Sequence, residues 1–296
     1  MAQTKIHPAL RLLPSLTDAA FILPIAFIFC RLNGAKTMLA DCDTGWHIRA
    51  GEWILANGRV PSTDMFSFTM PGAPWYAWEW LWEALFAWIN RHAGMAGVVL
   101  ASVAIISLTF ALLFRLVRRK SGNVLIAFVV TMLAMGASSL HWLARPHLFT
   151  FLFLVIFYAL LERAKDAGDS GRRLLWLLPA ITVLWTNLHG GFFTGILLIG
   201  TYAAGEFTTW VVSGDAEERR AALARGARYL ATTFGCFLAS FINPYSYKLH
   251  SHIIEFLRDP YQYEHISEFL SLNFHHPLGV VFEIVIVLGV VAAMRT

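Results

Sequence analysis

Two acidic residues and a histidine open the first long polar stretch of this chain, directly after an apolar segment. Residues 41–47 read Asp-Cys-Asp-Thr-Gly-Trp-His. Because Asp43 and His47 are four residues apart, a helix would place both side chains on one face. A carboxylate held in such a position can take a proton from a hydroxyl or an amide. The alternative is that Asp43 only caps this helix and that Asp41 is a solvated loop acid.

A second polar group surrounds a proline between two apolar segments, in the stretch His-Trp-Leu-Ala-Arg-Pro-His that ends at His147. The guanidinium of Arg145 is a planar fork of N–H groups that can bind two phosphate oxygens at once. We therefore predict that Arg145 and His147 bind substrate. The alternative is that Arg145 extends its side chain to the lipid headgroups.

A third polar group, Asn187 to Gly191, joins two further apolar segments. Asn187 and His189 are costly at the mouth of a membrane helix unless they have partners, so we predict that both contact substrate. Gly190 and Gly191 indicate a tight reversal or a close backbone approach. A purely structural hydrogen-bonded turn is the alternative. Glu79, on an aromatic stretch earlier in the chain, is a further candidate for binding substrate.

The composition places these residues in a membrane protein. The chain has 296 residues, of which 57% are apolar and 14% charged, and its mean hydropathy is +0.58. Soluble globular proteins carry about 25% charged residues, and disordered chains are less hydrophobic still. The net charge of +4 is small for a nucleic-acid-binding protein, so we expect no nucleic-acid partner.

We predict an all-α polytopic membrane protein that forms a single membrane domain over residues 1–296, with about eight transmembrane helices. The apolar segments are Ala19–Leu39, Met95–Phe114, Val124–Leu143, His147–Leu161, Leu174–Leu188, Phe192–Val212, Tyr229–Ile242 and Leu278–Met294. Three connections, Arg115–Lys120, Glu162–Arg173 and Ser213–Arg228, carry four basic residues each. Because basic loops are retained in the cytoplasm, we place these connections and both chain termini inside, in a plasma or inner membrane.

Two long loops then face away from the cytoplasm, over residues 40–94 and 243–277. The first loop predicts two amphipathic helices along the membrane surface. One begins at Asp43 or Thr44 and ends at Asn57-Gly58, and the other runs from Trp78 to Asn90. Between them, Met65–Thr69 alternates apolar and polar residues and predicts an extended piece before a turn.

This first loop resembles that of the GT-C superfamily of membrane glycosyltransferases, which includes oligosaccharyltransferases and protein mannosyltransferases. The resemblance rests on Asp43, which is followed by Gly45-Trp46-His47. It also rests on the Asp-x-Asp pattern that Asp41 and Asp43 form. Gly58 to Asp64 is similar to the mannosyltransferase stretch in which a second Asp follows a Gly. The resemblance covers roughly the first 95 residues; members of the superfamily are usually longer and often have a soluble C-terminal domain.

The resemblance implies that Asp41, Asp43, His47 and Asp64 form the catalytic set. It also implies that Asp41 and Asp43 are the ligands if a divalent cation such as Mg²⁺ or Mn²⁺ is used. The implied reaction moves a sugar from a polyprenyl-phosphate donor to a glycan, lipid or protein acceptor on the extracytoplasmic face. Such a transfer needs a base near the acceptor, and positive charge or a metal near the departing phosphate.

Two other functions remain open at the level of the sequence. A transporter or flippase of a lipid-linked or anionic substrate would line its passage with Asp43 and Arg145. Inverted repeats or broken midplane helices would favour transport, and the sequence shows neither. The shortness of the chain favours the other alternative, a catalytically silent membrane assembly subunit.

Overall fold

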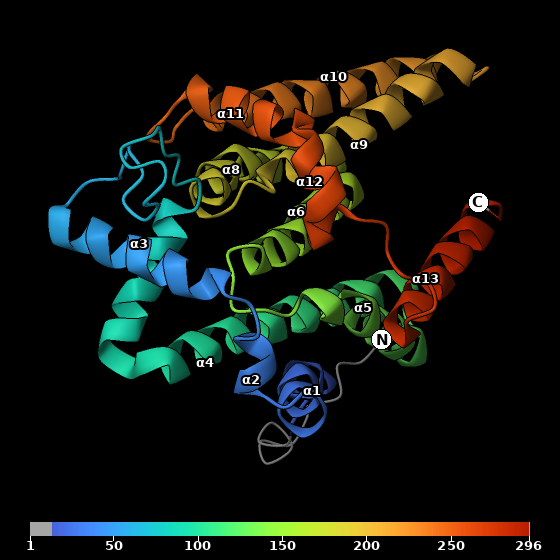
Figure 1. Ribbon diagram of the computed structural model, residues 1–296. Helices are drawn as coiled ribbons and strands as arrows, with labels where there is room; N and C mark the ends of the chain where they lie inside the picture. The colour runs from blue at the N-terminus through green and yellow to red at the C-terminus, as the bar shows by residue number, and fades with distance from the viewer. Residues whose placement is uncertain (1–13, 296) are drawn as a thin grey trace. The chain divides into compact units, whose positions relative to one another are not determined.

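The computed structural model describes residues 14–295, and this part of the chain is built from helices (Figure 1). No strand occurs among the described residues, where a single antiparallel bridge joins Thr63 and Pro74. The elements are α1 Leu16–Arg31, α2 Ala35–Met38, α3 Asp43–Asn57, α4 Trp80–Ser121, α5 Val124–Ser138, η2 Ser139–His141, α6 Leu148–Asp166, η3 Gly168–Gly171, α7 Arg172–Leu175, α8 Leu177–Leu188, α9 Phe192–Val212, α10 Ala216–Ala239, α11 Tyr247–Arg258, α12 Pro260–His265, η4 Ser267–Phe269 and α13 Pro277–Ala293. The all-helical fold class is therefore confirmed. The N-terminal end of the chain, which we placed inside, lies outside the described residues.

Three of the described helices are long and apolar enough to cross a membrane: Trp80–Ser121, Val124–His141 and Phe192–Val212. The helix Pro277–Ala293 is apolar but shorter. These helices support a membrane protein. The predicted count of eight spanning helices stays a prediction, because the other apolar segments form helices that are shorter or carry more charge.

The chain divides into two compact units. The first combines the described parts of Met1–Asp41 and Ser271–Thr296 with Val99–Ala144. Its core includes Trp142, which lies between the rings of Phe27 and Phe110 at centroid distances of 5.8 and 5.4 Å. Helices α5 and α13 pack together in this unit. The prediction of a single membrane domain stays a prediction.

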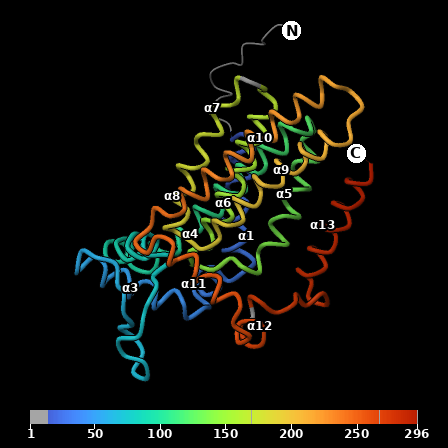
Figure 2. Tube along the Cα trace, turned by 90° about the horizontal axis from the view of Figure 1, so that it is seen from above, coloured from blue at the N-terminus to red at the C-terminus, as the bar shows by residue number. Residues whose placement is uncertain are grey.

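The second unit comprises Cys42–Val98 and Arg145–Leu270, and it contains every predicted site residue except Asp41. Helices α9 and α10 pair along their length, as both views show (Figure 1 and Figure 2). The ring of Trp185 on α8 packs against Phe153 and Phe157 of α6.

The first apolar segment is interrupted, contrary to the continuous Ala19–Leu39 segment that we predicted. Helix α1 ends at Arg31, and Asn33 and Gly34 both have positive φ angles, of 64° and 56°. Gly34 adopts this conformation without the steric cost that a β-carbon adds. The chain therefore turns before the short helix α2.

The first surface helix is confirmed at its C-terminal end. Helix α3 covers Asp43–Asn57, and Gly58 ends it with a left-handed φ of 64°. The prediction that Asp43 or Thr44 caps the helix is wrong, because Cys42 is the N-cap residue and Asp43 is already helical. The carboxylate of Asp43 is therefore available for contacts beyond its own helix.

The second surface helix and the apolar segment after it are two helices that meet at a kink within α4. Helix α4 begins at Trp80, and Gly94 interrupts it with φ 62° and ψ −172°. Helix α3 crosses the first part of α4 closely at Gly51, where a β-carbon would lie 1.9 Å from the backbone oxygen of Glu83. Glycine is thus the residue that lets the two helix backbones meet.

The loop between α3 and α4 is a reversal rather than an extended strand. Residues 65–70 form bends, and Gly72, with a φ of 78°, turns the chain back. Asp64 organises the reversal, since its carboxylate accepts hydrogen bonds from the backbone N–H groups of Phe66 and Ser67. The predicted turn is confirmed, whereas the predicted extended piece is wrong because these side chain–backbone bonds compete with it.

Candidate active site on the second unit

An arginine with two carboxylates forms the centre of the site. The guanidinium of Arg145 binds Asp43 Oδ2 through Nη2 and Glu268 Oε1 through Nη1, each at 2.7 Å. The Arg145 side chain is 20% exposed, so these charge-assisted bonds are partly shielded from water. Asp43 and Arg145 are distant in the sequence, and the fold brings them into direct contact. We call these three residues the Arg145 network.

The other oxygen of Asp43 also has a partner within its helix. The indole N–H of Trp46 donates to Asp43 Oδ1 over 3.1 Å. The same indole stacks on the imidazole of His47, with ring centroids 3.6 Å apart. Asp43 is therefore held at both oxygens, in one orientation, at the start of α3.

His47 is buried next to Asp43 and is fixed by a residue of α4. Its Nδ1 lies 3.1 Å from Glu83 Oε1, and the two side chains are 5% and 0% exposed. Desolvation, followed by the positive potential of Arg145, holds the pKa of His47 well below its usual range. His47 is thus a neutral imidazole whose ring Glu83 and Trp46 position.

Glu79 precedes α4 and is electrostatically coupled to the Arg145 network. Desolvation raises the pKa of its carboxyl from 4.5 to about 7; Arg145 opposes this rise and Asp43 adds to it. A carboxyl group with such a pKa exchanges its proton near neutral pH. Perturbed pKa values of this kind are more frequent at functional sites than elsewhere.

The hydrogen bonds around His189 determine its tautomer. The backbone N–H of Gly191 can only donate, and it points to His189 Nδ1 at 3.0 Å. The indole N–H of Trp185 donates to Thr150 Oγ1, whose own hydrogen then goes to His189 Nδ1, 2.8 Å away. Since Nδ1 accepts two bonds, the ring proton of neutral His189 is on Nε2.

A positive charge on His189 is strongly disfavoured. Desolvation, with His147 and Arg145 adding to it, lowers the pKa of His189 to about 3. Protonation at Nδ1 would also break both accepted hydrogen bonds. His189 therefore offers one neutral Nε2–H donor. A β-carbon on Gly191 would lie 2.3 Å from Thr150 Oγ1, which explains glycine there and confirms the predicted close backbone approach.

His147 is close to His189, whereas Asn187 has a structural role. The rings of His147 and His189 have centroids 6.4 Å apart. Asn187 accepts from the indole of Trp80 at 2.6 Å, and its amide donates to the backbone oxygens of Val183 and Ile242. Asn187 thus links α8 to two other segments. These bonds favour the structural alternative that we considered for it.

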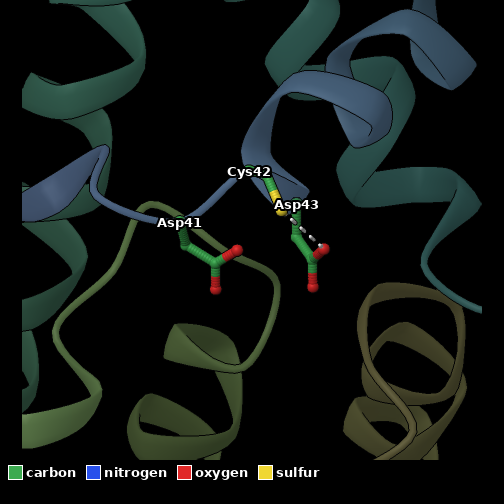
Figure 3. A group of neighbouring side chains, drawn as sticks. All are labelled: Asp41, Cys42 and Asp43. Atoms are coloured by element: carbon green, nitrogen blue, oxygen red, sulfur yellow. Dashed lines mark hydrogen bonds between the residues drawn. The ribbon is translucent and has the colours of Figure 1, made fainter.

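Asp41 is a neighbour of Asp43 in the chain, and Asp64 belongs to the loop between α3 and α4. Figure 3 shows Asp41, Cys42 and Asp43 at the start of α3. Their possible ligand atoms lie within 4.8 Å of one another. Neighbours in sequence come this close through the local chain, and exposed acidic groups are common without a metal. A cation at Asp43 would compete with Arg145 for Oδ2, so the metal ligands Asp41 and Asp43 stay a prediction. Asp64 bonds within its own loop.

The sequence did not single out three residues that hold the site together. Glu268 binds Arg145, Glu83 positions His47, and Thr150 orients His189. The sequence contains one indication that Glu83 belongs to the site: it follows Glu79 by four residues, which places both carboxylates on the same side of a helix. The sequence contains no such indication for Glu268 and Thr150, because their roles depend on contacts with residues far away in the chain.

Comparison of the chain with protein-family models, with curated proteins and with solved structures gives no match. The functional argument therefore rests on the site itself.

Proposed function

We propose that this protein is a membrane glycosyltransferase that moves a sugar from a polyprenyl-phosphate donor to an acceptor. The observation that carries the proposal is the contact of Asp43 with Arg145 at 2.7 Å. One of these residues can bind or deprotonate an acceptor, and the other can bind a phosphate. The two functions that such a transfer needs are thus in contact.

In the proposed reaction, Arg145 binds the phosphate of the sugar donor. Its guanidinium already holds two carboxylate oxygens in the geometry that phosphate oxygens would use. Glu268 occupies Nη1, so an incoming phosphate would replace the Glu268 carboxylate. The charge that builds on the departing phosphate would then be stabilised by a group already in place.

His189 and Glu79 take supporting roles in the proposed transfer. His189 would donate its Nε2–H to an oxygen of the substrate while remaining neutral, since its pKa of about 3 keeps it unprotonated. Glu79, with a pKa of about 7, would accept or return a proton. Asp43 would act on the acceptor. A divalent cation at Asp41 and Asp43 is not needed for these steps.

The proposal also includes the finer topology. Eight helices would cross the membrane, both termini would lie in the cytoplasm, and residues 40–94 and 243–277 would face outward. The supporting observation is that the basic stretches lie at the C-terminal ends of α4 and α6 and after α9, whereas Asp43 and Arg145 lie at other helix ends. A plasma or inner membrane would then carry the active face outside.

Substitution of Asp43 tests the proposed activity. The measurement is transfer of labelled sugar from polyprenyl-phosphate donors by the full chain in proteoliposomes. Asp43→Asn keeps the size of the side chain but removes its charge and its ability to take a proton. We expect transfer to fall by about 10²–10⁴-fold. Asp64→Asn is the matched control and should lose far less activity. Wild-type transfer by Asp43→Asn would contradict the role of this carboxylate.

Cysteine labelling tests the proposed orientation. Phe68 is 94% exposed at the tip of the first loop, and Arg173 lies in a connection placed inside. In a chain whose native cysteines are replaced, Phe68→Cys should react with an impermeant thiol reagent added outside intact cells. Arg173→Cys should react only after the cells are opened. The reverse pattern would overturn the topology.

A further inference from the structure

A basic cavity lies at the end of the second unit where α6 leads into α7. Its volume is about 370 Å³, within the range of roughly 300–1,000 Å³ for small-ligand sites. One wall comes from the end of α6, from Gly168 and from α7, and the other comes from α10. Ala221 and Ala224 of α10 line it, and such small side chains leave the space open.

Cations surround this cavity on both walls. Lys165 and Arg172 line one wall, and Arg225 and Arg228 line the other. On α10, Arg225 and Arg228 are three residues apart, so they share a face of the helix. The chemistry that fits four cations around one space is an anionic group with several oxygens, such as a phosphate.

Two carboxylates hold one of these cations, Arg225, in place. Arg225 binds Glu206 at 2.8 Å and Glu218 at 2.6 Å. These carboxylates fix the Arg225 guanidinium between α9 and α10. Lys165 and Arg172 approach the same space from the opposite wall, so a ligand there meets cations from two sides.

An apolar and aromatic rim adjoins the cations. A second hollow of about 490 Å³ shares Arg172 and is lined also by Ser170, Arg173 and Trp176. The Trp176 side chain is 78% exposed, and Leu177 beside it is also exposed. Exposed tryptophan in a membrane protein is typical of the headgroup layer, where its ring is partly in contact with lipid. The cations therefore lie next to a surface suited to acyl chains.

We propose that this cavity binds the headgroup of an anionic phospholipid. Basic pockets between helices on the cytoplasmic side of membrane proteins bind such headgroups. The two connections that form this cavity are those that the excess of Lys and Arg places inside. Lys165, Arg172 and Arg228 bind the phosphate oxygens, while the exposed Trp176 and Leu177 contact the lipid chains. This site is separate from the Arg145 network and does not depend on the proposed transfer, although its cytoplasmic placement rests on the proposed topology.

Lipid binding by the full chain tests this proposal. The purified protein is titrated in neutral detergent with cardiolipin or with phosphatidylcholine, and bound lipid is counted by native mass spectrometry. We expect cardiolipin to be retained and phosphatidylcholine to be lost. Arg172→Gln with Arg228→Gln should weaken cardiolipin binding by about tenfold or more. Arg220→Gln is the matched control, because Arg220 is an exposed residue of α10 outside the cavity.

A second variant keeps every charge and fills the space. Ala224 is exposed on α10, so Ala224→Leu is compatible with the helix and should also weaken cardiolipin binding. Equal cardiolipin binding by the wild type, Ala224→Leu and the double arginine variant would overturn the proposal. A third arm adds inorganic phosphate at the same phosphorus concentration. Displacement of cardiolipin by phosphate in this arm would show a free-phosphate site and would also overturn it.

Discussion

The second unit contains two arginines that each bind two carboxylates, and they differ in where those carboxylates come from. Arg225 binds Glu206 and Glu218, which are 19 and 7 residues away on the hairpin of α9 and α10. Arg145 binds Glu268, 123 residues away, and Asp43 at the start of α3. The Arg225 contacts connect a helical hairpin that would form without them. The Arg145 contacts gather three distant segments around one guanidinium.

The surroundings of the two arginines differ as well. Near Arg145, desolvation perturbs the pKa of Glu79, His47 and His189. Titratable groups with shifted pKa values collect where a protein does chemistry, although ion-pair networks can shift them too. The comparison teaches that a bridged arginine alone does not mark an active site. Long-range convergence together with buried titratable groups is the stronger sign.

Removal of each arginine in turn gives the largest expected contrast. Arg145→Ala should reduce sugar transfer by about 10²–10³-fold, because it removes the group that stabilises charge on the departing phosphate. Arg225→Ala should leave transfer nearly unchanged and lower the melting temperature slightly, since partly exposed ion pairs contribute little. Transfer assays and thermal melts of both variants check this. Equal losses of transfer would remove the distinction between the two arginines.

The pH dependence of Glu79 offers a second test of the comparison. The folded-state pKa of Glu79 is about 7 and its ordinary value is 4.5. Its contribution to stability is therefore complete below pH 4.5 and is lost as the pH rises through 7. Glu79→Gln should flatten the fall in melting temperature over this range.

The same substitution should change the pH profile of transfer. The wild type should show an inflection near pH 7, and Glu79→Gln should lack it and lose about tenfold or more in rate. The unchanged inflection in Glu79→Gln would assign the titration to another group. Glu218→Gln, next to Arg225, serves as the control and should leave the profile unaltered.

The smallest expected effect concerns the second carboxylate of each arginine. Glu268→Gln removes a negative charge that competes with the donor phosphate for Arg145, so the donor should bind about two- to fivefold more tightly. Glu218→Gln should not change donor binding. Donor titrations of the transfer rate measure both. Weaker donor binding by Glu268→Gln would show that Glu268 supports the Arg145 fork rather than competing with phosphate.

The sequence predicted the local parts of the structure well. The apolar composition led to a helical membrane protein, and Asn57-Gly58 located the end of α3. The four-residue spacing placed Asp43 and His47 on one helix face, and Arg145 was singled out from its side-chain chemistry. These predictions rest on neighbours in the chain, for which periodicity and capping rules hold.

Long-range contacts could not be predicted in this way. Asp43 followed a capping pattern, yet its carboxylate binds Arg145. Asn187 was expected to meet substrate, yet Trp80, Ile242 and Val183 of its own helix occupy its polar atoms. The contact of Glu268 with Arg145 depends on how the last loop packs. The number of helices that cross a membrane depends on the membrane environment as well as on helix length, so the prediction of eight stays a prediction.

The close crossing of α3 and α4 at Gly51 constrains the sequences that homologues of this protein can have. Any side chain at this position would collide with the backbone of Glu83, and Glu83 is the residue that holds His47. A homologue that keeps the contact between His47 and Glu83 should therefore also have glycine at position 51. We expect distant homologues to share Gly51, Asp43 and Arg145, and these three positions can be used to recognise them. A homologue in which Gly51 is replaced should also lack the pair of His47 and Glu83.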